Sequence, residues 1–192
     1  MKVVILVYEG VYLLDFVGPL EIFYDTVDEE GRPAFEVYLV SPDSNAIKAH
    51  TGMSFHADDN LESSPKADIL VIPGGNLNLG SENPALANWI QSQARQAQII
   101  LSVCTGAFIL ADLGLLDGLQ ATTWFGATKA LQQQYPAIHV LTGERYVDNG
   151  QIVTTAGVSA GMDGALYVVQ RILGKTIAEN TARFIEYEWK RE

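Results

Sequence analysis

The sequence contains a single cysteine, Cys104, among 192 residues. One cysteine excludes an internal disulfide and a cysteine-based zinc site, so it is either a small buried hydrophobe or a reactive thiol. The three histidines, His50, His56 and His139, lack the spacing of metal ligands. We therefore expect no metal site.

Basic residues and long apolar runs are also scarce. Twelve Lys and Arg stand against 23 Asp and Glu, a formal charge of −11 that would repel a phosphate backbone. No apolar run approaches the roughly 20 residues that cross a bilayer, and the first ten residues do not resemble a signal peptide. We expect a cytoplasmic protein that acts on a small molecule, with no nucleic-acid or membrane partner.

Short β-branched runs alternate with longer helical patterns, which favours an α/β fold with a mainly parallel, buried sheet. The hydrophobic content of 48% is enough for one core, and we expect one domain over residues 1–192. Strands are predicted at 2–8, 35–41, 67–75 and 98–103. Crossover helices are predicted to begin at Gly18-Pro19 and at Asn83-Pro84.

The second half of the chain adds a helix over 130–136 and then a hairpin turned by residues 148–150. Two helical segments, 159–173 and 176–189, close the chain. Gly174 between them is predicted to be a helix C-cap.

Cys104 lies where a predicted strand meets a predicted helix. The stretch from Ser102 to Gly106 resembles a nucleophile elbow with cysteine in place of serine. A sharp turn would direct the sulfur toward the edge of the sheet where ligands bind, beside amide groups at a helix N-terminus that favour a thiolate. We predict an ionised, accessible nucleophile, and the alternative is a buried structural thiol.

The stretch "IPGG", residues 72–75, ends another strand at the same edge of the sheet. The amides of Gly74 and Gly75 can be approached without side-chain obstruction, and with the Thr105 amide they could form an oxyanion-hole-like cradle. By itself, this sequence indicates only a turn.

Asp15 follows the first strand in the apolar stretch "YLLDFVGPLEIF". A carboxylate in these surroundings is costly to ionise, which would raise its pKa enough for proton transfer near neutrality. The alternative is that Asp15 caps the following turn.

The stretch "ATTWFGAT" supplies hydroxyls and rings that could line a pocket. Thr123 and Trp124 are the candidates for substrate contact. The alternative is that Trp124 and Phe125 belong to the core.

The ordered set "LLDFVGPLEIF", "DILVIPGG", "ILSVCTGAFILADLGLLDG", "ATTW" and "TTAGVSAGMDGALYVV" resembles the ThiJ/PfpI superfamily, which is related to class I glutamine amidotransferases. The resemblance runs from Lys2 to about Trp189 and is strongest to the isocyanide hydratase branch. Thr105 follows the cysteine, as in that branch, whereas peptidase-like members carry a histidine there. Trp124 and Ser159 depart from the pattern of the branch.

This resemblance implies a flavodoxin-like three-layer sandwich and a homodimeric, cofactor-free enzyme that hydrates isocyanides to N-substituted formamides. Carried over to this chain, Cys104 would be the nucleophile, Asp15 the acid and base, and Thr105 an active-site hydroxyl and amide. Gly74 and Gly75 would contribute pocket amides. The apolar segment 184–189 also favours a homodimer because it needs cover.

Two other functions remain open at this stage. The same superfamily supports glyoxalase or deglycase chemistry on small carbonyls, which usually relies on a histidine beside the cysteine. An elbow thiolate could instead serve a redox or small-molecule sensor without turnover.

Overall fold

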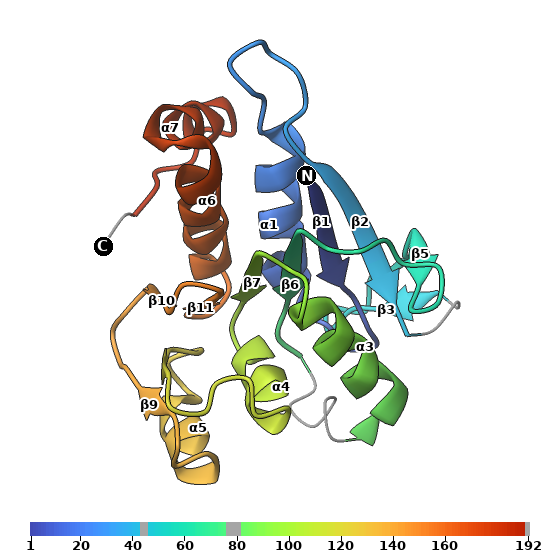
Figure 1. Cartoon of the computed structure of the whole chain (residues 1–192), viewed down its shortest axis with the longest axis vertical. Coiled ribbons are helices and arrows are strands. Elements are labelled where there is room, and N and C mark those ends of the chain that lie inside the picture. Colours follow the sequence, from blue (N-terminus) through green and yellow to red (C-terminus); the bar gives the residue numbers. More distant parts are fainter. Residues whose placement is uncertain (43–45, 76–81, 191–192) are drawn as a thin grey trace.

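A seven-stranded sheet forms the centre of the computed structural model, which describes residues 1–42, 46–75 and 82–190 (Figure 1). The strand order is β10-β11-β7-β6-β1-β2-β5, and every neighbouring pair is parallel except β10 and β11. The strands are β1 (Lys2–Leu6), β2 (Glu36–Ser41), β5 (Asp59–Asn60), β6 (Ile69–Ile72), β7 (Ile99–Ser102), β10 (Tyr146–Asp148) and β11 (Ile152–Thr155). The predicted mainly parallel α/β fold is confirmed.

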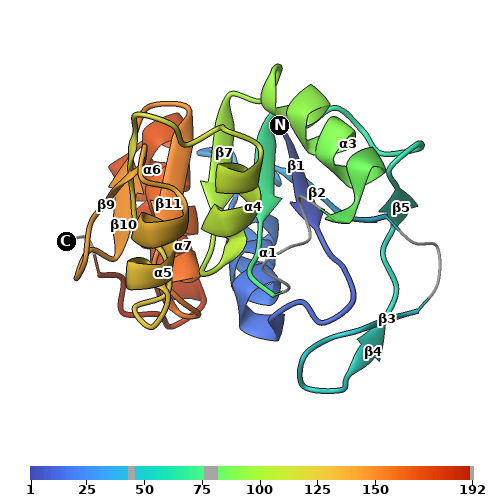
Figure 2. The same cartoon turned by 90° about the horizontal axis from the view of Figure 1, so that it is seen from below.

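Helices cover both faces of this sheet (Figure 2). One face carries α1 (Leu13–Asp25), α6 (Ala160–Leu173) and α7 (Lys175–Phe184), which pack against one another. The other face carries α3 (Pro84–Ala94) and α4 (Gly106–Asp112). The remaining elements are α5 (Thr128–Gln134) and two small sheets, β3 (Ile47–Lys48) with β4 (Ser54–Phe55) and β8 (Gln120–Ala121) with β9 (His139–Val140).

The central strands are short apolar runs because both of their faces are covered. All residues of β6, β7 and β11 are buried, and in β1 only Lys2 is exposed. This continuous burial is typical of a parallel sheet between two helical layers. Within the described ranges, no helix is long and apolar enough to span a membrane.

The predicted start of the first helix is wrong. α1 begins at Leu13, so Gly18 and Pro19 lie inside the helix rather than at its entry. A Cβ at Gly18 would lie 2.8 Å from Met162 Cγ, which shows that the glycine permits close packing of α1 on α6. Pro19 has no N–H to donate to the carbonyl oxygen of Asp15.

The ends of other helices follow the predictions more closely. The Asn83 side chain caps α3 by accepting from the Leu86 amide at 3.0 Å, and Gly174 ends α6 with a φ of 93°. The last helix is shorter than predicted and ends at Phe184. Glu186 then adopts a φ of 53°, which turns the chain out of the helix.

Candidate functional site

The switch in strand order places three candidate segments at one edge of the sheet. The chain moves from β1 to β2 in one direction and from β6 to β7 in the other, so a crevice forms at the carboxyl ends of β1 and β6. Asp15 follows β1, Gly74 and Gly75 follow β6, and Cys104 follows β7. The predicted residues therefore meet where this fold binds ligands.

Cys104 forms the predicted elbow. Its φ of 57° lies in the left-handed region, which a side chain other than glycine occupies only when its surroundings impose it. The Cys104 amide donates to Ala156 O at 3.1 Å, and the Thr123 hydroxyl donates to Cys104 O at 2.6 Å. A Cβ at Gly106 would lie 2.1 Å from Ile72 O, so only glycine fits after the elbow.

Asp15 is fully buried in the first turn of α1. Its Oδ2 accepts from the Gly74 amide at 3.1 Å. No donor in the described ranges forms a hydrogen bond of good geometry to Oδ1, which leaves that oxygen available to accept a proton. Its side chain does not cap α1, so the structural alternative is wrong.

Burial raises the pKa of Asp15 to about 6. The Gly74 amide, the Cys104 thiol and the Val158 amide lower this pKa because they stabilise the carboxylate, but burial outweighs them. The carboxylate is therefore largely ionised at neutral pH and takes up a proton within the physiological range.

The prediction of an ionised sulfur is wrong, and the sulfur is only slightly exposed although it borders a cavity. Cys104 is 4% exposed, and burial together with the charge of Asp15 raises the pKa of its thiol to about 12. The Thr105 and Val158 amides act in the opposite direction, as expected at a helix N-terminus, but are weaker than burial. The thiol keeps its proton and faces a carboxylate.

The amides of Gly74 and Gly75 do not form the predicted cradle for a ligand, because both already donate to side chains of the protein. The Gly75 amide donates to Thr105 Oγ1 at 3.0 Å, while the Gly74 amide is bound to Asp15. A Cβ at Gly74 would lie 2.7 Å from both Asp15 Oδ2 and Thr105 Oγ1. These glycines position the carboxylate and the hydroxyl rather than offering their amides to a ligand.

Thr123 and Trp124 differ in their surroundings, because Thr123 is buried and Trp124 is partly exposed. Thr123 is 1% exposed, and its hydroxyl donates to the carbonyl oxygen of Cys104. The hydroxyl is therefore not free to contact the substrate, which differs from the prediction. Trp124 is 40% exposed and lies between two glycines, where a Cβ at Gly126 or Gly157 would come within 2.5 Å of the indole. The indole is therefore fixed in place and is not part of the core.

A cavity of about 380 Å³ opens beside the sulfur. It is lined by Tyr12, Gly75, Cys104, Thr105, Trp124 and Val158. Neither Tyr12 nor Val158 was predicted from the sequence to be a site residue. Val158 follows β11, which runs parallel to β7, so its position at the same sheet edge was the signal that could have identified it.

His50 lies closer to the site than the sequence indicated. Its ring stacks on Tyr12 with centroids 3.9 Å apart, and its Nδ1 accepts from the Leu13 amide at the start of α1. Its imidazole also lowers the pKa of Asp15 through an electrostatic interaction. The sequence indicated only that this histidine lacks the spacing of a metal ligand, and its proximity to the acid was not predicted.

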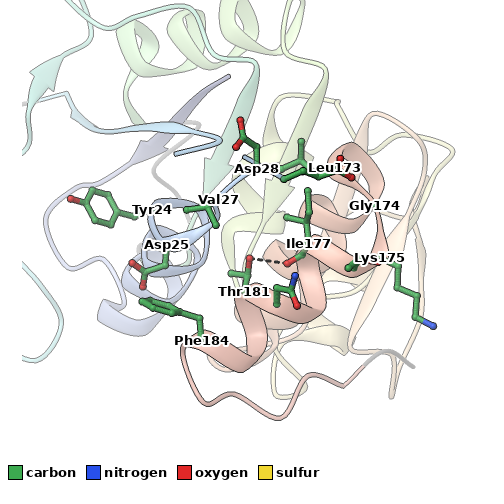
Figure 3. A pocket seen from close by; sticks show the side chains of 13 residues that line it. Tyr24, Asp25, Val27, Asp28, Leu173, Gly174, Lys175, Ile177, Thr181 and Phe184 are labelled. Atoms are coloured by element: carbon green, nitrogen blue, oxygen red, sulfur yellow. Dashed lines mark hydrogen bonds between the residues drawn. The ribbon is translucent and has the colours of Figure 1, made fainter. Parts of the chain in front are cut away.

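A larger cavity, of about 630 Å³, lies away from this chemistry (Figure 3). It is bordered by Tyr24 and Asp25 at the opposite end of α1 from Asp15, and by α7 residues such as Ile177 and Phe184. Neither the thiol nor Asp15 borders it. The smaller cavity is therefore the candidate active site.

Comparisons with known proteins agree with this geometry. A family model described as DJ-1/PfpI matches residues 1–171. Isonitrile hydratase from Pseudomonas putida is 30% identical over 190 residues, which cover 97% of this chain and 78% of that protein. The HTH-type transcriptional regulator CdhR from Pseudomonas aeruginosa is 33% identical over 141 residues, which cover 73% of this chain but 42% of the regulator.

A solved structure extends the agreement to the fold. The crystal structure of a ThiJ/PfpI family protein from Pseudomonas syringae superposes with a TM-score of 0.86 and 27% identity, covering 98% of this chain and 76% of that one. Together with the family match over most of the sequence, these similarities show that the chain belongs to the DJ-1/PfpI family.

Proposed function

We propose that this protein hydrates isocyanides to N-substituted formamides, with Cys104 as the nucleophile and Asp15 as the proton carrier. The observation that carries the proposal is a protonated thiol facing a carboxylate whose pKa is about 6, at the wall of a small cavity. The similarity to an isonitrile hydratase over nearly the whole chain supports the same chemistry.

In the first half of the reaction, the thiol adds across the terminal carbon of the isocyanide. Asp15 accepts the thiol proton as the sulfur attacks that carbon, because a sulfur with a pKa of about 12 does not ionise in advance. Asp15 then delivers the proton to the same carbon. The product is a thioimidate, R–N=CH–S, bonded to Cys104.

In the second half, water adds to the thioimidate carbon while Asp15 takes one proton from the water and passes it to the substrate nitrogen, which becomes the N–H of the formamide. The C–S bond then breaks as the new hydroxyl becomes the carbonyl group, and the hydroxyl proton passes through Asp15 to the sulfur. The sum is one isocyanide and one water giving one formamide, with the enzyme unchanged. One carboxylate that alternates between base and acid serves both halves.

The other predicted residues assist this scheme. We propose that the Thr105 hydroxyl, held by the Gly75 amide, donates to the reacting nitrogen or to water. Trp124 and Tyr12 would contact the substituent on that nitrogen, because both border the cavity. Thr123 supports the elbow from behind.

The test is formamide production from a simple alkyl isocyanide by the purified protein. Wild-type protein is expected to turn over, and Cys104→Ala is expected to be inactive while remaining folded. Full activity in Cys104→Ala would contradict the proposal. A parallel assay of methylglyoxal conversion to lactate separates this chemistry from the glyoxalase alternative.

A second candidate is small-molecule sensing without turnover, which the similarity to the regulator CdhR favours. In that case, isocyanides or other small ligands would raise the melting temperature without being consumed. A redox sensor based on a thiolate is less favoured, because burial and Asp15 keep the sulfur protonated.

We also propose that the protein forms a homodimer. The apolar segment 184–189 was expected to need cover from a second subunit. Residues 187 and 189 pack on the core of their own chain, so this need now applies only to Phe184, which is 72% exposed. Leu14 and Tyr12, each about 40% exposed, form a second apolar surface beside the active site. Sedimentation of wild type, Leu14→Glu and Phe184→Glu tests both surfaces, and a wild-type mass near 20.9 kDa would contradict the dimer.

A further inference from the structure

A partly buried ion pair lies close to the turn that supplies Val158 to the active site. Asp163, in the first turn of α6, is fully buried. Its Oδ2 accepts from the guanidinium of Arg145, which comes from the segment just before β10. Only the carboxylate is buried, since the Arg145 side chain is 26% exposed, and without the guanidinium the Asp163 charge would be costly to bury. The pair therefore fixes the two segments relative to each other.

The other oxygen of Asp163 holds the C-terminal segment in place. Asp163 Oδ1 lies 3.1 Å from the Tyr187 hydroxyl and accepts from the Lys190 amide at 3.0 Å. The chain that leaves α7 is therefore tied back to the start of α6.

Two of the partners of Asp163, Arg145 and Tyr187, also contact Ser159. The Arg145 guanidinium donates to Ser159 Oγ at 3.4 Å, and the Tyr187 hydroxyl lies 3.3 Å from Ser159 O. The backbone of Arg145 adds a further link, because its carbonyl oxygen accepts from the Ala156 amide at 2.9 Å. The turn over residues 156–159 is thus held by groups that depend on Asp163.

This turn needs such support because it contains a strained residue. Val158 has a φ of 54°, a conformation that a β-branched side chain adopts only when its surroundings impose it. In that conformation Val158 borders the same cavity as Cys104, and its backbone amide lowers the pKa of both the Asp15 carboxyl and the Cys104 thiol.

We propose that Asp163 is a positioning residue, which acts through Arg145 and Tyr187 to keep the Val158 amide directed at Cys104 and Asp15. Its effect on turnover rests on the proposed function. Its effect on the reactivity of the sulfur does not, and can be measured without any isocyanide.

Loss of Asp163 is expected to raise the pKa of the Cys104 thiol. The Val158 amide stabilises the negative form of the sulfur, so moving it away makes the thiolate harder to form. The other groups that face the sulfur are Tyr8, Asp15 and the Thr105 amide, and His50 acts on Asp15. None of these four is bonded to Asp163, so their influence is retained in a variant of that residue.

The experiment follows alkylation of the single cysteine by iodoacetamide near neutral pH, measured by intact mass. Only the thiolate reacts at an appreciable rate, so the rate constant reports the thiolate fraction. Asp163→Asn is expected to slow alkylation about tenfold, which corresponds to one pKa unit. If the isocyanide reaction operates, kcat/KM falls by a similar factor.

Asp148→Asn is the matched control. Asp148 of β10 binds Arg171 and the Tyr167 hydroxyl of α6. This is another Asp–Arg–Tyr group that involves α6, but its hydrogen bonds do not reach Ser159. This variant is expected to lose stability without a change in the alkylation rate.

Tyr187→Phe is the milder second variant, because it removes one hydroxyl and leaves the ion pair intact. It is expected to slow alkylation by a few fold while the melting temperature stays close to that of the wild type. An unchanged or faster rate in both folded variants, or an equal slowing in Asp148→Asn, would overturn the proposal. If no isocyanide is hydrated even by the wild type, the proposed function fails, and the alkylation rates still decide this inference.

Discussion

Replacing Asp15 with Asn is expected to change thiol reactivity and isocyanide turnover in opposite directions. The carboxylate of Asp15 is the second largest cause of the raised pKa of the Cys104 thiol, after burial. Asparagine has nearly the same shape, and its side-chain oxygen can still accept from the Gly74 amide. The substitution therefore removes a charge and a proton acceptor while changing the local packing little.

The magnitude follows from the electrostatics of the pair. A neighbouring charge of like sign within about 4–6 Å shifts a pKa by about 1–3 units, so removal of the Asp15 charge should lower the thiol pKa by about that amount. Below the pKa, each unit gives about ten times more thiolate and a similarly faster alkylation. Turnover should nevertheless fall by about 10²- to 10⁴-fold, because asparagine cannot accept and return the proton that the proposed mechanism assigns to Asp15.

The assay pairs iodoacetamide alkylation, followed by intact mass, with formamide formation from the same protein preparation. Cys104→Ala serves as the blank for both measurements, and a thermal melt verifies folding. Slower alkylation in Asp15→Asn would show that the carboxylate promotes ionisation instead of opposing it. Turnover near the wild-type value would show that the proton travels by another route.

Three further outcomes are expected. Because the folded pKa of Asp15 is about 6 and the ordinary value of this carboxyl is 3.8, the protonated form favours folding. Stability should therefore rise by about 2 kcal/mol as pH falls from about 7 to 4, and Asp15→Asn should abolish that contribution in melts across this range. Gly106→Ala should unfold or severely destabilise the protein because its Cβ meets Ile72 O, whereas Gly143→Ala, with open space around it, should cost only about 1–2 kcal/mol by denaturant titration. Trp124→Ala should raise KM for an alkyl isocyanide while leaving the alkylation rate within about twofold, and a loss confined to kcat would contradict its role as a cavity wall.

Much of the fold could be predicted because the central strands are buried on both faces and read as short apolar runs. The first helix was misplaced for a physical reason. Gly18 and Pro19 resemble a helix entry, but tertiary packing on Met162 gives the glycine a different purpose and the helix accommodates the proline. Local sequence signals cannot anticipate contact with a helix that lies more than a hundred residues away.

The site shows a similar division. The position of Cys104 at an elbow and the raised pKa of Asp15 both followed from local sequence, because they depend on a strand end and an apolar neighbourhood. The protonation of the sulfur did not, since it depends on burial and on a carboxylate brought from another segment. Val158 was missed because its amide, and not its side chain, enters the site.

Pro19 gives the acid a mechanical property that the rest of α1 lacks. An ordinary residue at this position would donate its amide hydrogen to the carbonyl of Asp15 and lock that turn into the helical ladder. With a pyrrolidine ring there, the peptide unit that carries the carboxylate is released from that constraint. Small displacements of the carboxylate, such as those needed to follow a proton from sulfur to carbon, therefore need not bend the rest of α1.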